Sequence, residues 1–516
     1  MEPSFARGKL MLASFLTLVA SGVGFATRTA AGPAWEREFG ISGEQFGVIM
    51  GAGFLGFGLM IFFGGILVEK LGYKLLLGLA FLMHLVSAGM LFTATPENAF
   101  SMLFWSAFVF SICQGLYEAV INPLIAQLYP ENQTHYLNIL HAGWPAGMII
   151  GGLFAAGFMG NNPWFSEIAW TTAMSFFVVF VIAYGILAFP VKFPETIGES
   201  SSNFGQLFSC FASVPFLILL VLHGLIGYME LGVDSWMTKL MENLLPNAIL
   251  ILVYTSALMF VLRFFAGPIV HKINPIGLLF GSSVIACLGL LWLSQPIESV
   301  ALILVAATFY SLGKAFLWPT MLGVAGERYP QSGSIAMGAL GAVGMITVGQ
   351  IGGARIGVQQ GYHMSAELEA ASADTFSRYS GDAQDSYGYQ YTGIAGDKLG
   401  LANKIGEETD AAKISEIIAG SNLTDADKAV FQEHAATDVS LVRDANLAGS
   451  RLALRDTAAI PGCMAIGFLI LLGYYKSIGG YKVLTVEEAL GGSAPEPPAD
   501  GGGGDDGGAA PETADS

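Results

Sequence analysis

Four ionisable residues lie within stretches of the sequence that are otherwise apolar. Glu118 lies in the run MLFWSAFVFSICQGLYEAVINPLI and Lys314 in the run SLGKAFLWPTML, while Arg28 and Glu230 lie in two further apolar runs. An ionised side chain at the centre of a membrane span costs roughly 2.5–3.5 kcal/mol on insertion scales. Such residues persist mainly where they face protein or a watery cavity, so we expect them to bind a proton or a polar solute.

Two mechanisms are open for Glu118. In a poorly hydrated cavity its carboxyl group would hold a proton more tightly and could exchange it near neutral pH. If Lys314 or Arg28 lies within about 4–6 Å, the carboxyl group would stay ionised, and a proton or a solute hydroxyl would compete with the basic partner. A buried salt bridge that only joins two helices is the structural alternative.

Arg28 follows Gly22 and Gly24, and these small neighbours leave space around its long side chain. A guanidinium group in a cavity could capture a carboxylate or phosphate through two parallel hydrogen bonds. Because Arg28 lies late in its apolar run, its side chain could instead extend to the membrane interface. The sequence leaves both interpretations open.

Two tryptophans and one asparagine could contact the same solute. Asn122 lies four residues after Glu118 on the same helical face, where it could bond a solute hydroxyl or the backbone carbonyl freed by Pro123. Trp318 lies four residues after Lys314, and Trp318 or Trp236 could stack on a sugar ring. Tryptophans are also common at membrane interfaces, which is the alternative for both.

The overall composition predicts a membrane protein built from helices. Hydrophobic residues make up 53% of the 516 residues and charged residues only 12%. Apolar runs of about 20 residues, which cross a bilayer as helix, recur twelve times, and backbone groups in lipid must pair within each run. The expected spans are 9–31, 44–67, 74–95, 100–126, 136–160, 167–190, 212–236, 247–270, 275–295, 299–324, 334–357 and 456–475.

The net charge of −17 belongs mainly to two hydrophilic segments. Residues 358–450 hold fifteen acids against six bases, and residues 491–516 hold six acids and no base. An even number of spans puts both termini on one side, and the surplus of Lys and Arg on that side predicts that it is cytoplasmic. We therefore expect residues 358–450 to form an external insert, a small helical cap that acts as a spacer or lid, and residues 491–516 to be a disordered acidic tail.

The two halves of the chain carry matching sequence features. The stretch GGILVEKLGYK follows the second span and AGPIVHKINPI follows the eighth. Aligning Pro123 with Pro319 sets Glu118 opposite Lys314, because each lies five residues before its proline. The repeat predicts two halves of parallel topology. We expect an N-terminal bundle at 1–191, a linker at 192–206, a C-terminal bundle at 207–475 interrupted by the insert, and a tail at 476–516.

The stretch from Gly65 to Lys74 resembles the loop signature G-x-L-x-D-R-x-G-R-K of the major facilitator superfamily of secondary transporters. Glu69 and Lys70 stand at the acidic and basic positions, and Gly72 at the second glycine. The resemblance implies an all-α membrane protein with twelve transmembrane helices in two pseudo-symmetric halves. We expect Gly65, Glu69, Lys70, Gly72 and also Arg263 to belong to the cytoplasmic gate.

Within this superfamily the chain is similar to the fucose permease-like group of sugar:proton symporters. The stretches that carry the similarity are EAVINP, LNILHAGWPAGMIIGG and GYMELGVDSWM. The resemblance implies that Glu118 takes part in proton coupling and that Asn138 and His141 lie near the sugar. It also implies that the first, fourth, seventh and tenth helices line the central cavity. A histidine on an apolar helix can also be a satisfied core residue, which is the alternative for His141.

Together these features predict a permease of the plasma (inner) membrane that moves a sugar or sugar derivative by alternating access, with protons as the coupling ion. A transporter of organic anions such as sugar acids is the alternative that Arg28 and Lys314 suggest. A transporter-like receptor that uses the insert as its ligand domain is a third. We expect no enzyme, cofactor, metal or nucleic-acid partner, because no nucleotide loop, metal cluster or nucleophile with its base is visible. We also expect a monomer in the bilayer.

Overall fold

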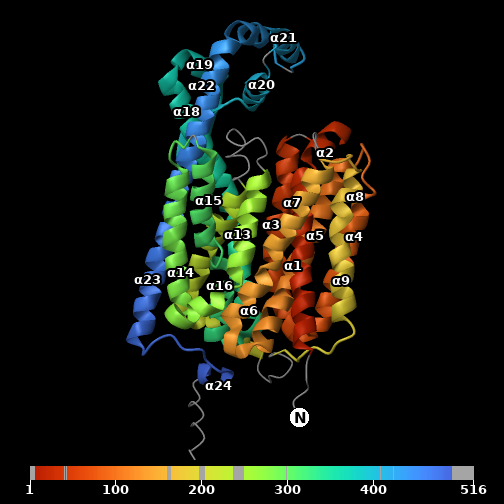
Figure 1. Ribbon diagram of the computed structural model, residues 1–516, viewed down its shortest axis with the longest axis vertical. Coiled ribbons are helices and arrows are strands. Elements are labelled where there is room, and N and C mark those ends of the chain that lie inside the picture. Colours follow the sequence, from red (N-terminus) through yellow and green to blue (C-terminus); the bar gives the residue numbers. More distant parts are fainter. Residues whose placement is uncertain are drawn as a thin grey trace, which may run out of the picture.

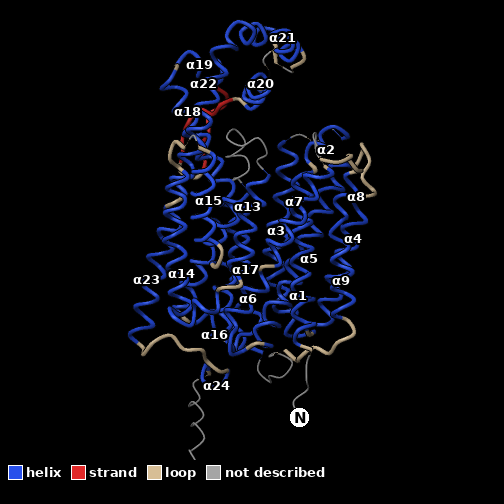
Figure 2. The backbone as a smooth tube through the Cα atoms, viewed as in Figure 1, coloured by secondary structure: helices blue, strands red, loops and turns tan. Residues whose placement is uncertain are grey.

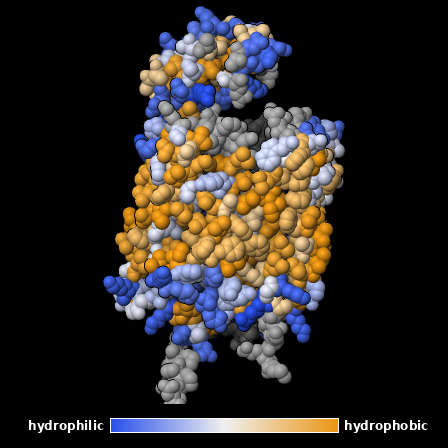
Figure 3. Space-filling model, viewed as in Figure 1, coloured by the Kyte–Doolittle hydropathy of each residue, from blue (hydrophilic) through white to orange (hydrophobic). Residues whose placement is uncertain are grey.

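Long apolar helices make up most of the molecule, and they stand side by side in a bundle (Figure 1). The computed structural model describes residues 6–39, 41, 43–159, 164–196, 204–235, 249–297, 299–406, 408, 410–421 and 423–490. Within these residues, eleven helical runs are long and apolar enough to cross a membrane, and Leu250–Arg263 is a shorter apolar helix. On the visible face of the bundle, an apolar belt lies between two more hydrophilic ends (Figure 3). The expected helical membrane fold is therefore confirmed.

The helices of the N-terminal half run from α1 to α9. Their bounds are α1 Arg7–Ala30, α2 Gly32–Phe39, α3 Gly43–Leu71, α4 Tyr73–Leu91, α5 Ala99–Leu128, η1 Pro130–Asn132, α6 Gln133–His141, α7 Gly143–Phe158, α8 Trp170–Met174, η2 Ser175–Phe177 and α9 Val178–Ala188.

The C-terminal half begins at η3 and includes a lobe that projects from one end. Its elements are η3 Phe204–Ala212, α11 Val214–Gly227, η4 Tyr228–Gly232, α13 Ile249–Arg263, α14 Ala266–Leu293, α15 Val300–Lys314, α16 Leu317–Arg328, η5 Pro330–Ser332, α17 Gly333–Thr347, η6 Val348–Gly352, α18 Gly353–Ala371, α19 Ala373–Tyr379, β1 Ser380–Ser386, β2 Tyr389–Ile394, α20 Gly396–Gly406, α21 Ala411–Ala419, α22 Asp425–Thr457, α23 Ala459–Ser477 and α24 Val486–Ala489.

The turns after the second and eighth spans have nearly the same backbone conformation. Gly72 has φ 77° and ψ 163°, and Asn274, at the matching position of the repeat, has φ 56° and ψ 166°. This region is open to glycine and strained for other residues. The side chain of Asn274 offsets part of the strain, because its Oδ1 accepts a hydrogen bond from the Gly277 amide at 2.9 Å. The eighth span thus comprises α13 and the first residues of α14, and the ninth begins at Pro275.

Prolines interrupt two helices near the middle of the bundle. We number the membrane helices 1–12 by the expected spans, so that α1, α3 and α5 are helices 1, 2 and 4, and α11 with η4, α13, α17 and α23 belong to helices 7, 8, 11 and 12. Helix 5 is divided into α6 and α7 at Ala142, and helix 10 into α15 and α16 after Lys314. A proline has no amide hydrogen, so the carbonyl group four residues before it loses its helical partner. Pro145 and Pro319 therefore free the carbonyl groups of His141 and Ala315.

The insert forms a separate lobe beyond one end of the bundle, which we call the insert face (Figure 1). The opposite end, where the N-terminus lies, is the terminal face. Helices α18 and α22 extend from the bundle into the lobe, and β1 pairs with β2 as an antiparallel hairpin (Figure 2). A small apolar cluster that includes Leu368, Tyr379, Phe431 and Val442 fills the interior of the lobe. The lobe is mainly helical, and the hairpin is an element that the expected helical cap did not include. The tail at 491–516 lies outside the described residues.

Candidate functional site

A central cavity lies between the two halves, with residues from helices 1, 2, 4 and 5 on one side and from helices 7, 8, 10 and 11 on the other. Its volume is about 90 Å³, and most of the wall is aromatic or aliphatic. A predominantly apolar cavity with a few convergent polar groups is the usual form of a small-molecule site. The polar lining residues are Arg28, Ser111, Gln114, Glu118, His141, Glu230, Asp234, Ser235 and Arg263.

Glu118 meets a neutral hydrogen-bond partner, Asn122. Asn122 Nδ2 donates to Glu118 Oε2 at 3.3 Å, and Asn122 Oδ1 lies 2.9 Å from His141 Nε2. Because the amide nitrogen faces the carboxyl group, the amide oxygen must accept, and His141 Nε2 carries the hydrogen. Within the described chain no ion pair of Glu118 is formed, so neither Lys314 nor Arg28 is its salt-bridge partner in this state.

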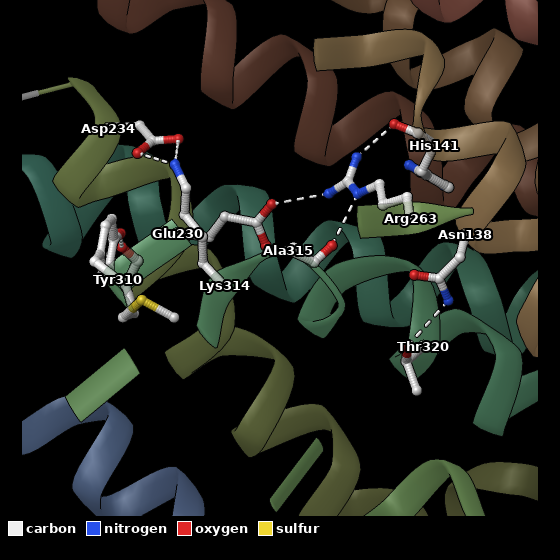
Figure 4. Close-up of polar contacts among 10 residues, drawn as sticks. Asn138, His141, Glu230, Asp234, Arg263, Tyr310, Lys314, Ala315 and Thr320 are labelled. Carbon is white, nitrogen blue, oxygen red and sulfur yellow. Dashed lines mark hydrogen bonds and ion pairs between the residues drawn. The ribbon is translucent and has the colours of Figure 1, made fainter. Parts of the chain in front are cut away.

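Arg263 lies in the cavity wall, closer to the candidate solute site than a gate residue was expected to be. Its side chain is 2% exposed, and the guanidinium group bonds three oxygens from three helices (Figure 4). Nε donates to the Ala315 carbonyl at 2.8 Å, Nη1 donates to the His141 carbonyl, and Nη2 lies 3.2 Å from Glu230 Oε1. The two carbonyl groups are those that Pro319 and Pro145 free.

Lys314 pairs with Asp234 on helix 7 (Figure 4). The ammonium group also lies 5.2 Å from the centre of the Tyr310 ring, and the side chain is 1% exposed. Lys314 is not among the residues that line the cavity, and its expected contact with a solute stays a prediction. The sequence did contain a signal for Asp234, because it lies four residues after Glu230 in GYMELGVDSWM and so shares its helical face.

Arg28 lines the cavity with its guanidinium carbon 4.5 Å from the centre of the Phe110 ring. No carboxylate of the described residues forms an ion pair with it. The residue is 7% exposed, so it faces the protein interior rather than the membrane interface. Arg28 is therefore available to an anionic group that enters the cavity.

Of the two candidate tryptophans, Trp318 lines the cavity and its ring centre lies 4.4 Å from that of His223. Trp236 lies outside the described residues. The expected place of Asn138 near a sugar stays a prediction, because Asn138 is not among the residues of the cavity wall: its Nδ2 donates to Thr134 O at 2.8 Å and to Thr320 Oγ1 at 3.1 Å. Asn138 thus joins the halves.

The halves also meet near the terminal face. Glu69 Oε1 accepts from the Ser334 amide at 2.7 Å, and a Cβ on Gly65 would lie 2.8 Å from the Ser334 carbonyl oxygen. Glu69 and Gly65 thus lie at a close contact between helices 2 and 11. Lys70 is exposed beside them, and Gly72 forms the turn that follows.

A sequence profile of the Major Facilitator Superfamily matches residues 11–354, about two thirds of the chain. The chain belongs to the major facilitator superfamily. The match ends at residue 354, before the lobe and α23.

Individual relatives are more distant. The L-fucose-proton symporter of Escherichia coli K12 is 24% identical over 131 residues, which span 25% of this chain and 30% of that relative. A crystal structure of the transporter FucP in the outward conformation gives a TM-score of 0.56 at 19% identity, covering 68% of this chain and 91% of that one. The proton:xylose symporter XylE, bound to 6-bromo-6-deoxy-D-glucose, gives 0.58 at 14% identity over 67% and 87%. The human organic anion transporter MFSD10 gives 0.57 at 14% identity over 68% and 93%. At these identities the structures show the shared fold alone.

Proposed function

We propose that the protein is a proton-coupled secondary transporter that moves a sugar or sugar derivative by alternating access. The observation that carries the proposal is Glu118, a buried carboxyl group in the cavity wall that meets Asn122 and no cation among the described residues. Burying an unpaired carboxylate is costly, so such a group favours the uptake of a proton when water is excluded. Release of this proton to water on the other side of the membrane would couple the movement of the proton to that of the solute.

The relatives support the sugar part of this proposal. A fucose-proton symporter and a xylose symporter with a bound glucose derivative are among the similar proteins. The cavity wall offers the aromatic face of Trp318 and the polar side chains of Gln114 and His141, which suits a ring with several hydroxyl groups. The basic residues near the termini support a cytoplasmic terminal face and an external insert.

Transport in proteoliposomes tests the function directly. We expect the purified protein to exchange labelled L-fucose, D-xylose or another neutral sugar in counterflow, and to accumulate it when the outside is acidic. Counterflow also separates a transporter from a receptor that uses the lobe, because a receptor would bind the sugar without exchanging it. Binding of any sugar without exchange would overturn the transport proposal.

A sugar acid is the second candidate solute, and Arg28 is the observation that favours it. Arg263 and Lys314 are each neutralised by a carboxylate, so Arg28 is the remaining cavity cation of the described residues. With Glu118 ionised, the charges of these basic groups and of the cavity carboxylates balance. Protonation of Glu118 then leaves one positive charge for a monoanion to neutralise.

The two solutes differ in the current that they produce. One proton carried with one monoanion such as D-galacturonate moves no net charge, whereas one proton carried with a neutral sugar does. We expect Arg28→Gln to abolish D-galacturonate binding if the solute is a sugar acid and to spare binding if the solute is a neutral sugar. Electrogenic uptake of a neutral sugar that survives Arg28→Gln would exclude the sugar-acid alternative.

A further inference from the structure

Three residues on one face of α6 form hydrogen bonds with residues of the C-terminal half, and we call these three contacts the seam. Thr134 Oγ1 donates to Glu327 Oε1 at 2.7 Å, Asn138 Nδ2 donates to Thr320 Oγ1 at 3.1 Å, and the His141 carbonyl accepts from Arg263. Spacings of four and three residues keep all three on the same side of a helix. The seam therefore runs along helix 5 from near the terminal face to the cavity.

The innermost contact of the seam depends on the two prolines. The carbonyl groups of His141 and Ala315 have no helical donor, because Pro145 and Pro319 occupy the positions that would supply one. Arg263 supplies both missing donors from α13. A buried carbonyl group without a partner is costly, so both helix breaks favour an arginine at this place.

The same guanidinium group reaches into the cavity. Its third oxygen partner is Glu230 Oε1, and Glu230 lines the cavity wall. The other carboxyl oxygen, Glu230 Oε2, has no hydrogen-bond partner among the described residues. Arg263 is thus a direct link between a cavity carboxylate and the contact of the two halves (Figure 4).

We propose that Arg263 is a positioning residue that transmits events at Glu230 to the seam, and that its detachment from the His141 carbonyl allows the terminal side to open. The proposal rests on the alternating-access function given above. Opening on the terminal side requires helix 5 to leave α13 and α16, so every contact of the seam must part. The Arg263 contact carries a charge, which makes it stronger than a neutral hydrogen bond. A solute hydroxyl group that donates to the Glu230 carboxylate competes with Arg263 for its negative charge.

Pro145→Ala tests the link without changing any charge. The substituted residue would supply an amide hydrogen to the His141 carbonyl and so compete with Arg263, while the helix itself would gain a bond. The matched control is Pro461→Ala, in helix 12, whose described contacts are with other elements of the C-terminal half. Spin labels at Glu131→Cys and Lys272→Cys, both exposed near the terminal face, report the distance between the halves in lipid nanodiscs. The four native cysteines are replaced first.

We expect Pro145→Ala to raise the terminal-open population by about tenfold, as weakening one charged hydrogen bond would, and Pro461→Ala to leave the distance distribution unchanged. Arg263→Gln should have the same effect. The double variant should have no more effect than either single variant, because both substitutions break the same bond between the halves, that of Arg263 to the His141 carbonyl. A wild-type distribution for Pro145→Ala, or additive effects in the double variant, would overturn the proposal. These measurements use no solute, so they stand apart from a failure of sugar transport.

Discussion

The carboxyl groups of the two halves have contrasting surroundings. In the N-terminal half Glu118 meets an amide that in turn meets a histidine, both neutral donors in this arrangement. In the C-terminal half Glu230 meets Arg263 and Asp234 meets Lys314. Protonation of a carboxylate without a cation leaves no charge unpaired, whereas protonation of a paired carboxylate leaves its buried cation without a partner. The contrast suggests a mobile charge in one half and fixed charges in the other.

The largest effect is expected at Glu118. Glu118→Gln keeps the size and the bond to Asn122 but cannot release a proton, so we expect it to retain counterflow of L-fucose and to lose accumulation driven by a pH gradient. Uptake with and without the gradient in proteoliposomes gives the measurement.

Glu230→Gln is the comparison variant for this experiment. It removes a paired carboxylate from the same cavity, so we expect weaker solute binding but a dependence on the gradient that persists. Accumulation at the wild-type level in Glu118→Gln would show that the carboxyl group is structural and would end the contrast between the halves.

The fixed pair in the C-terminal half gives the next effect. Asp234→Asn leaves the Lys314 ammonium group buried and unpaired, which costs roughly 3–5 kcal/mol of stability. Lys314→Met should cost less, because the Asp234 side chain is 22% exposed and water can reach it. Thermal unfolding in detergent measures both.

The double variant Lys314→Met with Asp234→Asn tests whether the pair acts as a unit. Removing both charges should recover most of the stability that Asp234→Asn loses. If the double variant unfolds at a lower temperature than Asp234→Asn alone, the pair contributes more than mutual neutralisation.

The sequence predicted the fold and several charged residues of the cavity wall for a physical reason. Charged residues in lipid-facing positions are costly, so Arg28, Glu118 and Glu230 had to face inward, and all three line the cavity. Helical spacing also placed Asn122 beside Glu118, where the structure has it.

The partners of the basic residues were harder to predict. The repeat places Glu118 and Lys314 at matching positions of their halves, but it says nothing about the distance across the cavity, and Asp234 on a neighbouring helix is the partner of Lys314. Asn138 shares a helical face with His141, yet that face turns toward α16. Two of the three bonds of Arg263 depend on helix breaks in different halves, and no local pattern shows that one arginine reaches both.

The two matching turns offer a smaller test of the repeat. Gly72→Ala places a side chain at φ 77°, where strain costs on the order of 1–3 kcal/mol. Asn274→Gly relieves the same strain in the other half but loses the bond to the Gly277 amide, so we expect a change below about 1 kcal/mol. Thermal unfolding of both variants measures the difference. Equal destabilisation by the two substitutions would show that the turns are not equivalent in energy.

The smallest effect on transport is expected in the lobe, because the lobe lies outside the cavity wall. Thr375 is buried, and its hydroxyl group donates to Asp438 Oδ1 at 2.9 Å and accepts from Arg378 at 3.0 Å. Thr375→Val keeps the shape and removes both bonds, so it should cost the lobe roughly 1–3 kcal/mol. Ser440→Ala, an exposed hydroxyl group on the same helix as Asp438, is the control and should change stability by less than about 0.5 kcal/mol.

Hydrogen exchange separates the lobe from the bundle in this pair of variants. We expect Thr375→Val to speed exchange in α19 and in the part of α22 around Asp438, while the rates in α1 and α5 stay unchanged. Counterflow should also stay at the wild-type rate, because the lobe lies outside the cavity wall and beyond the stretch shared with the family. A loss of counterflow that accompanies faster exchange in the lobe alone would mean that the lobe takes part in the transport cycle, since its local stability would then set the rate of a step in the bundle.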